Sequence, residues 1–136
     1  MRRLAAALLV LACATGTPAV GAKCPLPRQT VMVEAQLFFG RDVAGRGPVS
    51  DDEWSDFTSS VIATEFPDGF TVTDGLGQWR DARSGGAVHE QSKIVLIVGR
   101  NGPRFATKLK KIAQSYRVRF HQDSVGVVTR DVCAAF

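Results

Sequence analysis

The sequence has few of the residues that most often bind metals or carry out nucleophilic catalysis. Its 136 residues include three cysteines and two histidines. The segment VHEQSK at 88–93 begins like the metalloprotease motif His-Glu-x-x-His, but Lys93 stands where the second histidine belongs. Neither a Cys-x-x-Cys pair nor a Gly-x-Ser-x-Gly motif occurs. We therefore expect no metal, no cofactor and no serine hydrolase.

Long apolar runs are also scarce. The first one, Leu4–Ala12, is too short to span a bilayer. Two arginines precede it and small residues follow it, which is typical of a signal peptide over residues 1–22, with cleavage before Lys23. In a second interpretation the leader is that of a lipoprotein and Cys13 becomes the lipidated N-terminus. Either way, the protein is expected to be exported to the periplasm or the cell envelope.

A strong excess of one charge is missing as well. The whole chain has a net charge of +4, and removal of the leader takes away two arginines and no acidic residue, which leaves +2. A balance this small gives little attraction for nucleic acid, so nucleic acid is not an expected partner. There is no internal repeat, and residues 23–136 have the length of a single domain.

Once the leader is removed or lipidated, two cysteines remain, Cys24 and Cys133. An even number of cysteines in an oxidising compartment predicts a disulfide between them. The bridge would close a loop of more than 100 residues, which stabilises the fold by about 4.7 kcal/mol in the chain-entropy model.

Hydrophobic spacing and turn residues predict four strands and two helices. The first helix has a complete start signal, a capping box with Ser50 as N-cap and Glu53 three residues later. The second begins near Pro103, a residue suited to the first turn. The expected elements are strand 30–39, a helix from 51, strand 70–79, strand 88–98, a helix from 103, and strand 124–132.

This β-α-β-β-α-β order indicates an α+β fold of the ferredoxin-like type. Right-handed crossovers place both helices on one face of a four-stranded antiparallel sheet. The first and last strands are then neighbours, so the start of one lies near the end of the other. Cys24 and Cys133 stand at these two places, so the topology agrees with the disulfide expected from the cysteine count.

The face of the sheet without helices is called the open face here. Within 33–39 the odd-numbered residues are all apolar and make the better core face. Glu34, Gln36 and Phe38 then lie on the open face, and the third strand is expected to add Lys93 at its polar end.

The apolar end of the open face is expected to hold Phe38, Val95 and Ile97. Such a patch is too apolar to be left in water comfortably. We expect a second copy of the protein to cover it, as a homodimer, and the alternative cover is the N-terminal segment 25–29 or a loop.

Four stretches carry a resemblance to a known family: VEAQLFFGR, FPDGFTVTDGLGQWRD, EQSKIVLIV and HQDSV, together with the late Cys133. The chain resembles, over residues 24–136, a family of small secreted bacterial proteins catalogued as a domain of unknown function. The block Gln78-Trp79-Arg80 is the most distinctive part. Members often look like lipoproteins, which favours lipidation of Cys13. The resemblance implies no activity and no catalytic residue.

Gln78-Trp79-Arg80 is the best candidate for ligand binding. A tryptophan at a strand end can stack on a flat or sugar ligand while the Arg80 guanidinium holds an anion. The alternative is that Trp79 closes the packing of the open face and that Arg80 pairs with Asp81 or Asp74.

A polar group on the open face is the second candidate, formed by Glu34, Gln36 and Lys93. Glu34 and Lys93 could form a cross-strand ion pair. In a half-covered pocket, Glu34 would instead be a general acid or base with a shifted pKa. The predicted ligand-binding residues are Gln36, Trp79, Arg80 and Lys93, and the candidate catalytic residue is Glu34.

The second helix is expected to show basic residues outward: Lys108, Lys110, Lys111, Arg117 and Arg119. They are solvated, or they lie against anionic headgroups if a lipid at Cys13 holds the protein at a membrane surface.

Taken together, the sequence favours an exported binding module of the cell envelope. The alternative is a small enzyme on the open face, with Glu34 as acid or base and Trp79 and Arg80 as a substrate clamp. A third class is a purely structural dimer.

Overall fold

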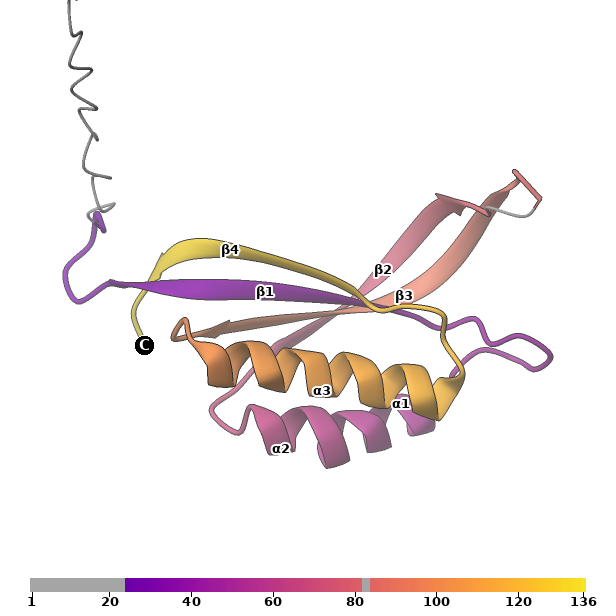
Figure 1. Ribbon diagram of the computed structural model, residues 1–136, viewed down its shortest axis with the longest axis horizontal. Coiled ribbons are helices and arrows are strands. Elements are labelled where there is room, and N and C mark those ends of the chain that lie inside the picture. Colours follow the sequence, from indigo (N-terminus) through magenta and orange to yellow (C-terminus); the bar gives the residue numbers. More distant parts are fainter. Residues whose placement is uncertain (1–23, 82–83) are drawn as a thin grey trace, which may run out of the picture.

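The computed structural model describes residues 24–81 and 84–136, which form a sheet with helices packed beneath it (Figure 1). Within these ranges no helix combines the length and the apolar character needed to cross a membrane. The elements are, in order, β1 Thr30–Gly40, α1 Asp51–Phe57, η1 Thr58–Ile62, α2 Ala63–Glu65, β2 Thr71–Arg80, β3 Ala87–Gly99, α3 Pro103–Phe120 and β4 Gly126–Ala134.

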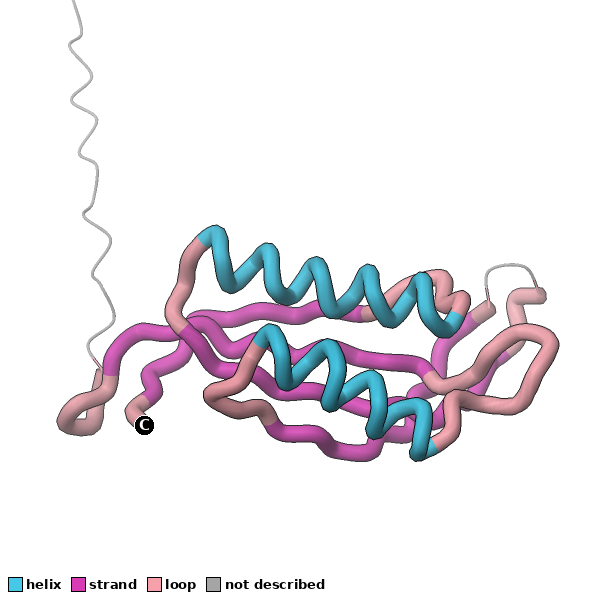
Figure 2. Tube along the Cα trace, turned by 90° about the horizontal axis from the view of Figure 1, so that it is seen from below, coloured by secondary structure: helices cyan, strands magenta, loops and turns pink. Residues whose placement is uncertain are grey.

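The sheet has the order β2-β3-β1-β4, and all neighbouring strands are antiparallel. The elements α1, η1 and α2 follow without a break and make one helix, in which η1 is wound as a wider π-helical segment. This helix and α3 lie side by side on one face of the sheet (Figure 2). The predicted α+β fold with a four-stranded antiparallel sheet and two helices on one face is confirmed.

The start of α1 shows how local sequence determines a boundary. Ser50 Oγ accepts a hydrogen bond from the Glu53 backbone N–H at 3.1 Å, and the Glu53 carboxylate accepts one from Ser50 N–H at 2.9 Å. These two bonds satisfy backbone donors that no helical carbonyl can reach. The predicted capping box is therefore confirmed.

The core lies between the helices and β1, as the odd-numbered positions of residues 33–39 predict. Phe39 is fully buried and packs edge-to-face on Tyr116, with ring centroids 4.8 Å apart. The Tyr116 hydroxyl donates a hydrogen bond to the Gly40 carbonyl at 2.8 Å, and burial raises its pKa above the usual range. This bond fixes the end of β1, where the loop to α1 begins.

The prediction of which β3 residues lie on the open face was wrong. Val95 pairs with Leu37 and Ile97 pairs with Ala35, so both lie on the covered face and are essentially fully buried. Lys93 shares that face. The open face of β3 instead carries the alternate residues, including Ile94 and Leu96. The stretch IVLIV is apolar at every position, so alternation gave no sign of which side faces the helices, and a shift of one residue exchanges the two faces.

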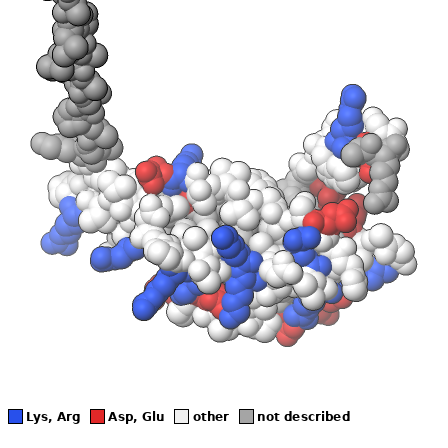
Figure 3. All heavy atoms as spheres, in the orientation of Figure 1, with Lys and Arg blue, Asp and Glu red and all other residues white. Residues whose placement is uncertain are grey.

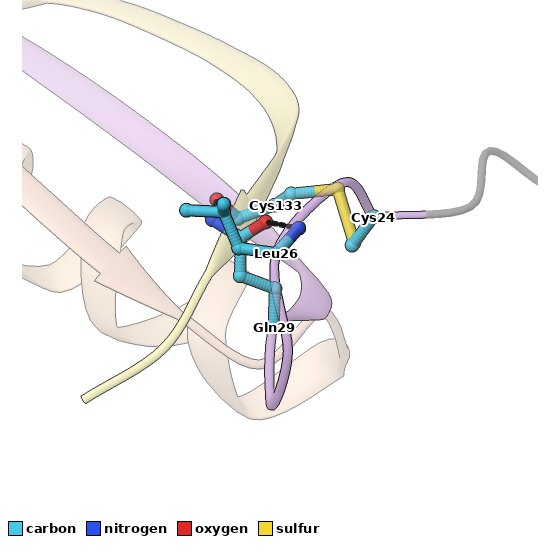
Figure 4. The surroundings of a disulfide bond; sticks show 4 residues. All are labelled: Cys24, Leu26, Gln29 and Cys133. Carbon is cyan, nitrogen blue, oxygen red and sulfur yellow. Dashed lines mark hydrogen bonds between the residues drawn. A yellow bond between two sulfur atoms is a disulfide. The ribbon is translucent and has the colours of Figure 1, made fainter.

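The disulfide between Cys24 and Cys133 is present, with Cα atoms 5.5 Å apart (Figure 4). It joins the segment before β1 to the end of β4, as predicted. Gln29 strengthens the same corner, since its side-chain amide donates to the Cys133 carbonyl at 3.3 Å and its Oε1 accepts from Leu26 N–H at 3.1 Å. A bridge of this kind indicates an oxidising environment.

Candidate active site

The open face is hollowed at one end. The β2–β3 hairpin extends past the other strands and curves away from the helices (Figure 1). Between this hairpin, the loop after β1 and the loop before β4 lies a hollow of about 700 Å³. We call it the Trp79 hollow. Its lining residues are Phe38, Gly40, Asp42, Ala44, Gly77, Gln78, Trp79, Val88, Glu90, Ser92, His121, Gln122, Asp123, Ser124 and Gly126.

Three strand glycines, Gly40, Gly77 and Gly126, line the hollow. A Cβ added at Gly40 would lie 2.8 Å from the Glu90 carboxyl carbon, and one added at Gly126 would lie 3.4 Å from Cβ of Phe38. Glycine inside a strand weakens it and often marks a place where a ligand or another group approaches the backbone closely. Here Gly40 leaves the space that the Glu90 side chain occupies.

Two aromatic side chains provide the apolar surface of the hollow. Phe38 is 37% exposed and Trp79 is 49% exposed, although aromatic rings of this size are usually largely buried. The indole Nε1–H of Trp79 donates a hydrogen bond to Glu90 Oε2 at 3.3 Å. The bond orients the ring and leaves much of its surface free to contact a ligand.

Both oxygens of the Glu90 carboxylate are held. Oε2 accepts from Trp79, and Oε1 accepts from the Asp42 backbone N–H at 2.9 Å. The Asp42 carbonyl in turn accepts from the Gln122 side-chain amide at 2.6 Å. These bonds connect the hairpin with both loops, so the carboxylate has a fixed position in the hollow.

The charge in the hollow has one sign. Asp42, Glu90 and Asp123 are acidic, and no lysine or arginine is among the lining residues that the structure describes. His121, the residue that ends α3 with a left-handed φ of 52°, lies at the same end. The hollow therefore combines a negative potential with exposed aromatic rings, a setting that suits a cationic ligand.

The structure does not bring the predicted site residues together. Trp79 lines the hollow. Arg80 is the next residue of β2, so the Arg80 side chain lies on the opposite face of the sheet. The predicted pairing of these two side chains as one clamp is therefore wrong. Gln36 is two residues from Phe38 on the open face and does not line the hollow.

Glu34 precedes Phe38 by four residues in β1, which is about 13 Å along a strand that rises about 3.3 Å per residue. Its carboxylate pairs with Arg130 at 2.8 Å and accepts from the Gln36 amide at 2.9 Å. These bonds, first that of Arg130, lower the pKa of Glu34 below its ordinary value. The carboxylate is thus stabilised in its charged form, which makes it a weak base.

Lys93 forms an ion pair with Asp74 at 2.5 Å, on the face that carries the helices. The cross-strand pair suggested for Lys93 and Glu34 does not form, because the two side chains lie on opposite faces of the sheet.

Sequence reasoning missed Glu90. The segment VHEQSK drew attention only as an incomplete metalloprotease motif. The signal that identifies Glu90 is pairing across the hairpin, since Trp79 faces Val88 and Gly77 faces Glu90, which puts Trp79 and Glu90 diagonally on one face. This signal can be read only when the pairing register of β3 with β2 is known.

The fold and the hollow define a ferredoxin-like α+β domain with an acidic, aromatic hollow on its open face. The chain belongs to the family described as "Protein of unknown function (DUF3574)", which matches residues 34–136. This confirms the resemblance to a domain of unknown function. No curated protein is significantly similar to the chain.

Solved structures share the fold, among them two of phage SAM lyases. One of these is a phage SAM lyase in complex with S-methyl-5'-thioadenosine, 21% identical, with a TM-score of 0.59, covering 76% of this chain and 90% of that chain. A second is a phage SAM lyase in the apo state, 16% identical, with a TM-score of 0.58, covering 85% of this chain and 92% of that chain. At these identities the likeness shows a shared fold.

The comparison corrects the leading interpretation of the sequence. A non-catalytic binding module of the cell envelope was favoured, but two solved structures that share the fold are of an enzyme.

Proposed function

We propose that the protein is a small enzyme whose active site is the Trp79 hollow and whose substrate is a small organic cation with a flat ring. One observation carries the proposal: the hollow has two exposed aromatic rings and three acidic residues, and its described lining contains no lysine or arginine. A cation over the face of Trp79 is attracted by the ring, by about 0.5–2 kcal/mol depending on exposure. The carboxylates add to this attraction.

Sulfonium nucleosides are the first substrates to test. S-adenosylmethionine has a cationic sulfur that a ribose joins to a flat adenine ring, so it meets both requirements of the hollow. The phage enzyme with this fold is a lyase for that compound and was solved with S-methyl-5'-thioadenosine. A shared fold alone does not assign an activity, so the proposal depends on the residues of the hollow.

In the proposed reaction the bond between the sulfonium sulfur and an alkyl carbon breaks. Its electron pair goes to sulfur, which becomes a neutral thioether. The alkyl fragment loses a proton from the adjacent carbon to the Glu90 carboxylate, and the electron pair of that C–H bond forms a carbon–carbon double bond. The hydrogen bonds from Asp42 and Trp79 hold the carboxylate in place for this transfer.

The experiment is to incubate the oxidised protein with S-adenosylmethionine and to follow S-methyl-5'-thioadenosine by chromatography and mass spectrometry. Glu90→Gln should lower kcat about 100-fold or more, in the range of a lost general base. Glu34→Gln is the matched control, because Glu34 is on the same face but outside the hollow, and it should keep the wild-type rate. S-adenosylhomocysteine, whose sulfur is neutral, should bind more weakly than the sulfonium.

The two variants show whether Glu90 or Glu34 is the base. Loss of activity in Glu34→Gln with full activity in Glu90→Gln would return the acid-base role to Glu34. If S-adenosylmethionine neither binds nor reacts, and S-methyl-5'-thioadenosine does not bind, the sulfonium assignment is wrong.

We also propose that residues 1–22 are a signal peptide, that residues 23–136 form the single mature domain, and that this domain resides in a bacterial periplasm or cell envelope. The disulfide supports an oxidising destination. After expression of the full chain in a bacterial host, the intact mass should correspond to an N-terminus at Lys23 or to a lipidated Cys13. An unmodified chain that retains its leader would contradict export.

Self-association through the open face remains a proposal, with a changed set of residues. Phe38 and Val128 are exposed there, and Ile94 and Leu96 replace the buried Val95 and Ile97. An apolar strip across three strands supports contact with a second copy.

A further inference from the structure

Strand β4 has a free edge. In the order β2-β3-β1-β4 it is the last strand, and in the part of the chain that the structure describes no other strand pairs with its outer side. Its exposed residues include Val127 and Val128, 43% and 55% exposed. Proteins usually protect a long apolar edge with charges, proline or a covering segment, because it offers backbone groups for pairing with another strand.

A groove runs beside this edge, between β4 and α3, with a volume of about 870 Å³. Leu109, Val125 and Val127 give it an apolar floor. The wall formed by α3 includes a stripe of the helix at spacings of four, three and four residues: Ala106, Lys110, Ala113 and Arg117. Ala113 stands between the two basic residues and leaves space there.

The charge of α3 is entirely basic. Its 18 residues contain six lysines and arginines and no acidic residue, and Lys and Arg side chains gather over this helix in Figure 3. Lys111 pairs with Glu65 and Arg119 pairs with Asp56. Within the described ranges, Lys110 and Arg117 have no acidic partner. Of the four basic residues of α3 without an acidic partner in these ranges, Lys110 and Arg117 line the groove, whereas Arg104 and Lys108 do not.

This charge distinguishes the candidate occupants. Residues 1–23 of the chain contain no acidic residue, so the leader does not complement the groove. A second copy joined edge to edge along β4 would bring two basic α3 helices face to face, and the like charges would oppose the contact. An occupant with negative charge and an extended backbone fits both the groove and the edge.

We propose that the β4 edge and its groove bind an extended segment of a partner protein in which acidic and apolar residues alternate. The segment would add a fifth strand to the sheet. Because side chains of a strand point alternately to the two faces, its acidic residues would reach Lys110 and Arg117 from the helix side. The site lies on the opposite face from the Trp79 hollow and does not depend on the proposed activity.

The test uses a fluorescein-labelled peptide of eight residues with alternating glutamate and valine, and binding to the oxidised protein is followed by fluorescence anisotropy. The double variant Lys110→Glu/Arg117→Glu should weaken binding at least 10-fold. Arg100→Glu/Arg104→Glu is the matched control: it changes the net charge equally at exposed positions outside the groove, and it should bind within about twofold of wild type. A peptide with lysine in place of glutamate should not bind.

Pairing with the strand edge has its own control. The same acidic peptide, N-methylated at the residues whose N–H groups would face β4, should bind at least 10-fold more weakly. Equal binding of the methylated peptide, equal effects of the two double variants, or no peptide binding would overturn the proposal. Binding of phosphatidylglycerol vesicles without binding of the peptide would also overturn it, in favour of a membrane surface.

Discussion

At the scale of single residues, the hollow depends on a glycine. Gly40 lies at the end of β1, directly under the Glu90 carboxylate. Its backbone is also fixed from the core side, because its carbonyl accepts the Tyr116 hydroxyl. The backbone of Gly40 therefore has little room to move when a side chain is added, and Glu90 has to move instead.

We predict that Gly40→Ala displaces Glu90 and disrupts ligand binding. The new Cβ would stand 2.8 Å from the Glu90 carboxyl carbon, so the hydrogen bonds to Asp42 and Trp79 would be lost or lengthened. Affinity for the cationic S-adenosylmethionine, measured by calorimetry, should fall at least 10-fold. Gly47→Ala is the control, since an added Cβ there meets nothing within 4 Å, and unchanged affinity in Gly40→Ala would contradict the role of Glu90.

Glu34 leads to a prediction of a different kind, in the pH dependence of stability. Arg130 and Gln36 hold the folded-state pKa of Glu34 below its ordinary value of 4.5. The stabilisation from this charged carboxylate is therefore fully present above pH 4.5 and is lost as the pH falls through the folded-state pKa. In urea titrations, wild type and Glu34→Gln should differ most above pH 4.5 and converge in acid. A difference that grows in acid would contradict the assignment.

At the scale of elements, sequence information was sufficient where a boundary is set locally. The capping box at Ser50 and the turn before α3 consist of neighbouring residues, and both were predicted. The face of β3 was not, because its second half is apolar throughout and its faces follow from pairing with β1, which is far away in sequence. Glu90 was missed because its place beside Trp79 follows from the register of the β2–β3 hairpin, which the turn residues alone do not give.

The N-terminus of α1 gives a stability prediction. Ser50→Ala removes the acceptor for Glu53 N–H and should lower the free energy of unfolding by about 1 kcal/mol. Ser55→Ala, at an exposed position of the same helix, should change it by less than about 0.5 kcal/mol. Urea unfolding followed by circular dichroism gives both values. Equal effects of the two substitutions would show that the capping box contributes little.

At the scale of the whole molecule, the disulfide connects the two ends of the described chain. Its cysteines are 109 residues apart, and the bridge holds the start of β1 against the end of β4. The double variant Cys24→Ser/Cys133→Ser should lose stability, by up to about 4.7 kcal/mol in the chain-entropy model. A reductant should destabilise the wild type in urea unfolding and leave the double variant unchanged. Equal stability of reduced and oxidised wild type would contradict a stabilising role for the bridge.

The open face determines whether one chain is the functional unit. If a second copy covers its apolar strip, light scattering across a range of concentrations should give the mass of a dimer. An aspartate in the strip would bury an unpaired charge at the contact, so Phe38→Asp and Val128→Asp should both give monomers. Val118→Asp is the control, because Val118 is 65% exposed on α3, and it should stay dimeric. Val128 does not line the hollow, so Val128→Asp also shows whether the activity needs the dimer. A wild-type monomer at every concentration would contradict self-association and would leave the hollow complete within a single chain.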